Sequence, residues 1–239
     1  MVSVPAPHEL KNFRALMIFA KKPVPGEVKT RLSPRLSAAE AAELYSCMLQ
    51  DTLATARGLA GITPVIFYQD DPGAGEYFAA VAPEIESLPQ SGEDLGERMR
   101  RAFAGMFARG FKEVVIIGTD SPNLPRGYIV EAFRLLEAEP VDLVLGPADD
   151  GGYYLLGLKR VRDGLFTGII WSSGEVFAAT VERAKDSLLG VSFLPMWHDI
   201  DTAADLERQE LLDPDSPAAR TREFIISIRQ PGIQYSADS

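Results

Sequence analysis

Lysine and arginine side chains cluster directly after the first apolar stretch of the chain, residues 15–20. The loop that follows holds five basic residues and three that restrict its path: Lys21, Lys22, Lys29, Arg31 and Arg35, with Pro23, Pro25 and Gly26. Lysine and arginine make charge-assisted hydrogen bonds to phosphate oxygens. Because α/β proteins bind ligands beyond the carboxyl ends of their strands, this loop is a candidate phosphate site. The alternative is a solvated surface loop, which is the usual place for lysines.

Carboxylates at two later positions could bind a divalent cation. Asp120 lies just after the predicted strand 113–118, and Asp201 lies in the sequence Asp199-Ile200-Asp201-Thr202. Either aspartate alone is explained as well by a helix N-cap. If both follow strands that end at one edge of a sheet, however, they would form an oxygen-ligand pair. Such a pair suits Mg²⁺ or Mn²⁺, and Mg²⁺ commonly binds through one or two carboxylates and substrate phosphates.

A third candidate is the turn Asp149-Asp150-Gly151-Gly152-Tyr153. Two glycines after two acids allow a tight turn with backbone close to a ligand, so Asp149 and Asp150 could face a substrate. A plain Asp-Gly hairpin turn is the alternative.

Three further residues give weaker signals. Gln90 precedes a predicted helix and could read a base edge or a hydroxyl, and Arg98 in its first turn could meet a phosphate. Trp171 could stack on a ring, although a tryptophan is more often part of the core. A surface position is the alternative for Arg98.

Composition and charge exclude several classes of protein. The chain has one cysteine, Cys47, and two histidines, so it cannot form an internal disulfide or a multi-histidine zinc site. Its net charge of -10 argues against broad nucleic-acid binding. The sequence shows no nucleophile–histidine–carboxylate spacing typical of triad hydrolases. It also has no Walker A phosphate loop and no Gly-x-Gly-x-x-Gly dinucleotide-binding motif after the first predicted strand. No apolar run reaches the ~18 residues of a membrane span, and the N-terminus lacks signal-peptide character, so we expect a cytoplasmic protein without a membrane partner.

The elements that must position these residues alternate between strand and helix. Apolar runs predict strands over 15–20, 62–68, 85–88, 113–118, 142–146, 152–158 and 191–194. Helical spacing and caps predict a helix that starts at Ser37 and continues at least to Leu53, and further helices over 73–82, 94–109, 127–139, 175–185, 202–211 and 217–228. This pattern indicates an α/β protein with a mostly parallel, mixed sheet and helices on both faces. We expect one domain over residues 14–229, with a loose arm at 1–13 and a frayed tail at 230–239.

The motifs taken together resemble a family. Residues 19–26, Lys29-Thr30-Arg31-Leu32, Gly118-Thr119-Asp120-Ser121-Pro122, the turn at 149–153 and residues 199–202 occur in one order over about residues 14–211. The set resembles a bacterial family of small transferases in the nucleotide-diphospho-sugar transferase superfamily, which has the Rossmann-like GT-A fold. It is more distantly similar to molybdopterin guanylyltransferase and 2-phospholactate guanylyltransferase.

The resemblance implies roles for particular residues. Nucleotide phosphates would contact the first loop, through Lys29 and Arg31 and also Lys21. From the residues themselves, and not from the resemblance, we place Pro25, Gly26, Gln90 and Arg98 on the same nucleotide side. Asp120 and Asp201 would bind Mg²⁺ or Mn²⁺. The acceptor would meet Asp149, Asp150, Gly151, Gly152 and Tyr153. We add Trp171 to the acceptor side only because its ring could stack on a ligand. In this chain, prolines replace most of the glycines that nucleotidyltransferases of this type carry in the first loop.

Three activities therefore remain open at the level of sequence. The resemblance favours a transferase that moves a nucleotidyl group from a nucleoside triphosphate to a small phosphorylated acceptor. In that reaction Lys29 and Arg31 would neutralise the leaving pyrophosphate. The alternatives are a glycosyltransferase that uses a nucleotide sugar, with Asp149 or Asp150 as base for a hydroxyl acceptor, and a non-catalytic nucleotide-binding protein.

Overall fold

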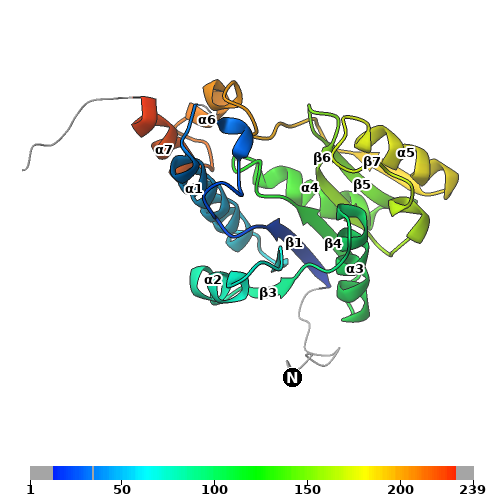
Figure 1. The fold of residues 1–239 in the computed structure, drawn as a ribbon. Helices are drawn as coiled ribbons and strands as arrows, with labels where there is room; N and C mark the ends of the chain where they lie inside the picture. Colours follow the sequence, from blue (N-terminus) through cyan, green and yellow to red (C-terminus); the bar gives the residue numbers. More distant parts are fainter. Residues whose placement is uncertain (1–12, 34, 230–239) are drawn as a thin grey trace, which may run out of the picture.

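The computed structural model describes residues 13–33 and 35–229, and Figure 1 shows their arrangement around one central sheet. Seven strands form this sheet in the order β3-β2-β1-β4-β6-β5-β7. Their bounds are β1 Arg14–Ala20, β2 Thr63–Tyr68, β3 Glu86–Pro89, β4 Glu113–Ile117, β5 Val141–Pro147, β6 Tyr153–Leu158 and β7 Gly190–Phe193. Only β6 runs antiparallel to its neighbours, β4 and β5. The predicted α/β fold with a mostly parallel, mixed sheet is therefore confirmed.

Helices cover both faces of the sheet. Their bounds are α1 Ala38–Arg57, α2 Ala74–Val81, α3 Leu95–Ala108, α4 Arg126–Glu137, α5 Val176–Asp186, α6 Gln209–Leu212 and α7 Ala219–Arg229. Side chains of α1, α2 and α4 pack in one core cluster, and those of α3 and α5 in another.

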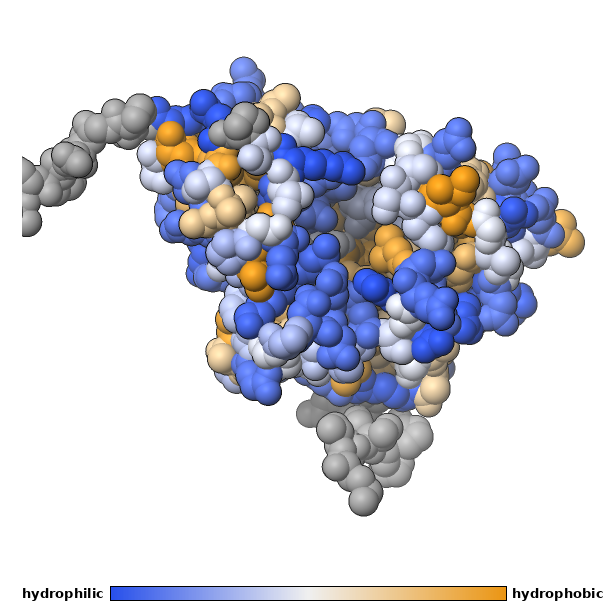
Figure 2. Space-filling view, viewed as in Figure 1, coloured by the Kyte–Doolittle hydropathy of each residue, from blue (hydrophilic) through white to orange (hydrophobic). Residues whose placement is uncertain are grey.

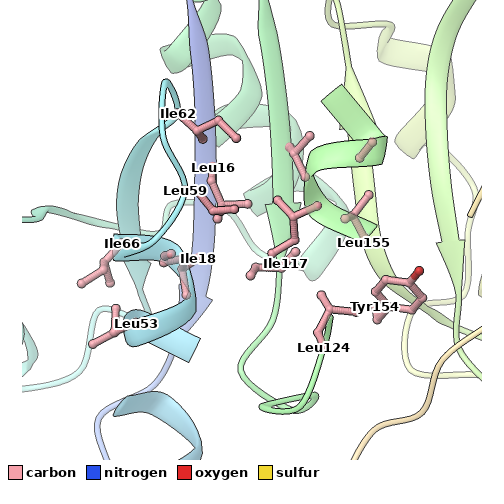
Figure 3. Close-up of a cluster of buried hydrophobic side chains, with 14 of the residues drawn as sticks. Leu16, Ile18, Leu53, Leu59, Ile62, Ile66, Ile117, Leu124, Tyr154 and Leu155 are labelled. Carbon is pink, nitrogen blue, oxygen red and sulfur yellow. The ribbon is translucent and has the colours of Figure 1, made fainter. Parts of the chain in front are cut away.

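Strand β1 shows how the sequence produces two buried faces. Leu16 and Ile18 point into the first cluster, whereas Ala15 and Met17 point into the second. Successive side chains of a strand alternate between faces, so a strand covered on both sides needs an unbroken apolar run. Figure 3 shows Leu16 and Ile18 packed with Leu53 of α1 and Ile117 of β4.

The C-terminal segment packs on α1, at the left of Figure 1. Leu44 and Met48 of α1 share a cluster with Ile200, Phe224 and other apolar side chains. Asp51 of α1 is 1% exposed, and its carboxylate accepts hydrogen bonds from the backbone N–H groups of Arg220 and Thr221 at 3.2 and 2.8 Å. This carboxylate caps α7 from a distant helix and thereby joins the C-terminal helix to α1.

Most predicted elements are present, and one is wrong. Instead of a helix over 202–211, the chain forms a 3₁₀ turn at Asp205–Glu207 and the four-residue α6. The cause is Asp205, whose Oδ2 accepts hydrogen bonds from the backbone N–H groups of Asp201 and Thr202 at 3.1 and 2.7 Å. An aspartate that captures nearby N–H groups stabilises a turn in place of a helix.

The two predicted end segments cannot be compared with the structure. Apart from Phe13, the arm at 1–13 lies outside the described residues, and so does the tail at 230–239. Within the described part of the chain, every helix is too short or too polar to cross a bilayer.

Candidate active site

A cleft of about 620 Å³ opens beyond the carboxyl ends of β1, β2, β3 and β4. Figure 2 shows the hollow in the middle of this face of the molecule. Its lining comes from the first loop, the turn after β4, the start of α3 and the segment after β7. The lining residues include Lys21, Lys29, Arg31, Gln90, Arg98, Asp120, Asp150, Tyr153, Asp199 and Asp201. Residues from across the sequence therefore meet where an α/β sheet binds ligands.

Lys29 lies at the centre of the acidic side of this cleft. Its side chain is only 5% exposed, and its Nζ donates to the carbonyl oxygen of Ile200 at 2.6 Å and to Asp201 Oδ1 at 2.8 Å. The same Nζ forms a close ion pair with Asp120 Oδ1. Burial alone would lower the pKa of Lys29, but the two carboxylates raise it above its usual value, so the ammonium stays charged.

The backbone at Lys29 is in the left-handed region, with φ +49° and ψ +36°. For a residue other than glycine this conformation costs roughly 1–2 kcal/mol. The three contacts of the ammonium offset that cost and hold the side chain inward. Asp120 and Asp201 thus meet at one edge of the sheet, and Lys29 is the residue that joins them.

Arg31 lies at the outer side of the same group. Its side chain is 73% exposed, and one guanidinium nitrogen lies 3.8 Å from Asp201 Oδ2. Because arginine carries five N–H donors and this side chain is largely exposed, Arg31 can offer donors to a ligand in the cleft.

The side chains of Asp199 and Ser121 extend the acidic side of the cleft. Ser121 Oγ donates a close hydrogen bond to Asp199 Oδ1. Burial, followed by the nearby charge of Asp120, raises the pKa of Asp199 to about 7. Sequence analysis noted Asp199 only as part of the acidic run, because nothing local shows that it is more enclosed than Asp201.

Tyr45 of α1 is a cleft residue that sequence analysis missed. Its buried Oη accepts hydrogen bonds from the backbone N–H of Lys21 and from Thr119 Oγ1, both at 2.8 Å. Lys21 follows β1 and Thr119 follows β4, so this hydroxyl fixes the two loops relative to each other. Its position within the apolar pattern of α1 gives no signal of this role in the sequence.

The turn at 149–153 separates its two acids. Asp150 lines the cleft, and its Oδ1 accepts a hydrogen bond from the Gly152 N–H at 2.8 Å. Asp149 instead pairs with Arg208 at 2.7 Å and lies outside the cleft lining. Gly151 has φ +89°, and a Cβ there would lie 2.0 Å from the Gly174 carbonyl oxygen. The turn therefore requires glycine at 151.

Some of the residues that we predicted to bind the nucleotide lie in the wall of the cleft, and others do not. Gln90 Nε2 donates to the Phe67 carbonyl at 2.8 Å, and Arg98 Nε donates to the Gly92 carbonyl at 3.1 Å. Both side chains line the cleft, as does Lys21, whereas Pro25 and Gly26 do not. Gly26 has φ +84°, so it serves the path of the loop.

On the predicted acceptor side, Tyr153 lines the cleft, but Gly151, Gly152 and Trp171 do not. The Trp171 indole instead covers Gly96, where an added Cβ would lie 2.3 Å from the ring. Ser172, the next residue, lines the cleft.

The donor set fits a divalent cation that substrate phosphates also bind. Within the described residues, no three His, Cys, Asp or Glu side chains are grouped closely enough to hold a metal ion. Asp120 and Asp201, however, remain 47% and 37% exposed beside their shared lysine. Mg²⁺ commonly binds through one or two carboxylates and substrate phosphates, so these two aspartates are the residues that could hold it.

Comparison with solved structures defines the class of protein. A protein from Desulfovibrio desulfuricans G20, provisionally described as a nucleotide-diphospho-sugar transferase, is 35% identical over 93% of this chain and 99% of its own, with a TM-score of 0.82. CMP:2-keto-3-deoxy-manno-octonic acid synthetase complexed with CTP is 13% identical over 81% and 95% of the two chains, with a TM-score of 0.53. Molybdopterin-guanine dinucleotide biosynthesis protein A from Archaeoglobus fulgidus is 13% identical over 89% and 99%, with a TM-score of 0.54. The chain therefore has the fold of the nucleotide-diphospho-sugar transferase superfamily, as the motifs predict.

The family assignment follows from the sequence itself. The chain belongs to the family described as "Uncharacterized protein conserved in bacteria (DUF2064)", whose profile matches residues 52–173. No curated protein matches the chain in sequence.

Proposed function

We propose that this protein is a Mg²⁺-dependent transferase that moves a nucleotidyl group from a nucleoside triphosphate to a small phosphorylated acceptor. The observation that carries the proposal is the joining of Asp120, Asp201, Lys29 and Arg31 in one cleft at the carboxyl edge of the sheet. The nucleotidyltransferases among the structural neighbours share the fold, and the relative from D. desulfuricans shares more than a third of the aligned residues.

In this proposal the two aspartates hold the metal ion. When bound, Mg²⁺ supplies positive charge that offsets the charge of the triphosphate. Asp120 and Asp201 keep exposed carboxylate surface toward the cleft, which lets them bind a cation and leaves room for phosphate oxygens.

The basic residues of the chain bind and orient the phosphates. The exposed guanidinium of Arg31 contacts the leaving pyrophosphate, with Lys21 and Arg98 lining the same cleft. A phosphate oxygen of the acceptor attacks the α-phosphorus in line, and the bond from that phosphorus to the bridging oxygen of the β-phosphate breaks. Because the attacking oxygen is already anionic, the step needs no general base, and catalysis depends on positioning and charge stabilisation.

A second candidate, glycosyl transfer from a nucleotide sugar, is favoured by Asp150. This carboxylate lines the cleft, where it could accept the proton of a hydroxyl acceptor. The description of the D. desulfuricans relative agrees with such a donor.

Product analysis separates these activities. The purified protein is incubated with Mg²⁺, a panel of nucleoside triphosphates or nucleotide sugars, and phosphorylated or hydroxyl acceptors. Acceptor-dependent release of pyrophosphate supports nucleotidyl transfer, and release of a nucleoside diphosphate supports glycosyl transfer. Nucleotide binding without either product contradicts both and supports a binding protein.

A matched pair of variants ties the activity to this cleft. Asp120→Asn removes one carboxylate of the pair, and Asp186→Asn makes the same change at an exposed position on α5. We expect Asp120→Asn to lose at least about 100-fold in turnover while staying folded, because positioned electrostatic groups contribute on that order. Asp186→Asn should retain full turnover.

A further inference from the structure

All three N–H donors of Lys29 are engaged in the structure. The ammonium has three donors, and its Nζ contacts three oxygens, from Ile200, Asp201 and Asp120. With 5% of the side chain exposed, the group has neither a free donor nor an open face for a phosphate. Lys29 therefore acts on the carboxylates, and the other cations of the first loop are the ones available to a ligand.

Arg31 and Lys22 show the contrast within the same loop. Arg31 is 73% exposed, and the one hydrogen bond of Lys22 within residues 13–33 and 35–229 is 3.3 Å long, to the carbonyl of Pro72. The chain places Lys29 inward even though its backbone must adopt a left-handed conformation to do so. Phosphate attraction alone would not require a buried lysine in that conformation.

The position of the ammonium affects any second cation. Lys29 uses Oδ1 of both aspartates and reduces the charge of the pair from -2 to -1. A divalent cation that approaches the exposed carboxylate surface meets a fixed positive charge a few ångströms away. Phosphate groups in the cleft would add negative charge on the open side and restore the attraction.

We propose that Lys29 is a positioning residue that competes with divalent cations for Asp120 and Asp201, so that the pair binds a cation tightly only together with a polyphosphate. This inference rests on the proposed function, since it assumes that these two carboxylates are the metal ligands. Lys29 thereby couples metal entry to substrate entry.

Mn²⁺ binding without any nucleotide tests the first half of the proposal. Binding is measured by water-proton relaxation on the full chain, its Lys29→Met variant and its Lys22→Met variant. Lys22→Met removes the same charge from the same loop without touching the carboxylates. We expect Lys29→Met to bind Mn²⁺ at least about tenfold more tightly than the unaltered protein, and Lys22→Met to remain within about threefold of it.

Several results would overturn the inference. These are equal Mn²⁺ affinity in Lys29→Met and the unaltered protein, weaker binding in a folded Lys29→Met, or an equal gain in Lys22→Met. Thermal unfolding confirms that each variant is folded. If Lys29→Met does not fold, Lys29→Gln, which is neutral but keeps hydrogen-bond donors, takes its place with the same expected gain.

Tripolyphosphate tests the second half, because it carries the charge of a triphosphate without a base or a sugar. In the unaltered protein it should increase protein-bound Mn²⁺ at least about tenfold, and in Lys29→Met the increase should be smaller. No increase in the unaltered protein contradicts the coupling. If the same preparation still turns over a nucleoside triphosphate, the proposed function is supported although the coupling by Lys29 is contradicted. The experiment therefore distinguishes failure of the coupling from failure of the proposed function.

Discussion

Replacing Tyr45 by phenylalanine is expected to weaken the connection between the two loops that carry the site. The change removes one oxygen and leaves the ring in place. The lost oxygen accepts two hydrogen bonds at 2.8 Å, from the Lys21 N–H and from Thr119 Oγ1, in a region where both Tyr45 and Thr119 are buried. The variant therefore leaves two donors without their partner.

The magnitude follows from these two bonds. A donor left unsatisfied in the interior costs about 1–3 kcal/mol. The Thr119 hydroxyl can rotate and the Lys21 N–H lies at the cleft, where water can reach it, so we expect a total near the lower end, about 2 kcal/mol. For a domain of this size the melting temperature should fall by roughly 4–8 °C.

Urea and thermal unfolding measure this loss, with Tyr128→Phe as the matched control. The ring of Tyr128 packs on Tyr154 and Trp197, and its hydroxyl has no hydrogen-bond partner among the described residues. The control should change the free energy of unfolding by less than about 0.5 kcal/mol. If Tyr45→Phe is also within that limit, its hydroxyl does not hold the loops and the reasoning is refuted.

Two further predictions concern the carboxylates of Asp51 and Asp199. Asp51→Ala should destabilise the chain by about 2–4 kcal/mol in urea unfolding, because it removes the cap of α7 and four hydrogen bonds, whereas Asp186→Ala should not. Asp199 has a pKa of about 7 in the folded chain, against about 3.9 in an unfolded one, so its contribution to stability is greatest at low pH and is lost as the pH rises toward 7. Asp199→Asn should remove about 1–3 kcal/mol of the stability difference between pH 5 and pH 8, and an unchanged pH profile would contradict the enclosure of this carboxyl.

Patterns of neighbouring residues correctly predicted those helices, strands and turns whose structure depends mainly on their own sequence. Ser37 and Glu40 predict a capping box, and both reciprocal hydrogen bonds are present at the start of α1. The unbroken apolar residues of β1 and β4 predict strands buried on both faces, which they are. The Asp-Gly turn at 150–151 forms the hairpin from β5 to β6 that makes the sheet mixed.

Structural features that depend on contacts between residues far apart in the sequence could not be predicted from local patterns. The helix predicted over 202–211 is absent because the Asp205 carboxylate captures N–H groups of its own turn and also binds Arg208, which reaches across to Asp149. The pattern of charges within residues 199–211 does not predict the contact between Arg208 and Asp149. The same limit applies to Tyr45, whose partners lie 24 and 74 residues away.

Lys29 shows why residue type and location do not determine role. A lysine in a basic loop after a first strand predicts a phosphate ligand, and the loop does lie at the cleft. The Lys29 side chain nevertheless turns toward carboxylates 91 and 172 residues further along the chain. This buried cation occupies an oxygen of each acid that a metal ion would also use, so we expect it to compete with the metal. The sign of the change in Mn²⁺ affinity on its removal tests this expectation: tighter binding identifies a competitor, and weaker binding in a folded variant identifies a support.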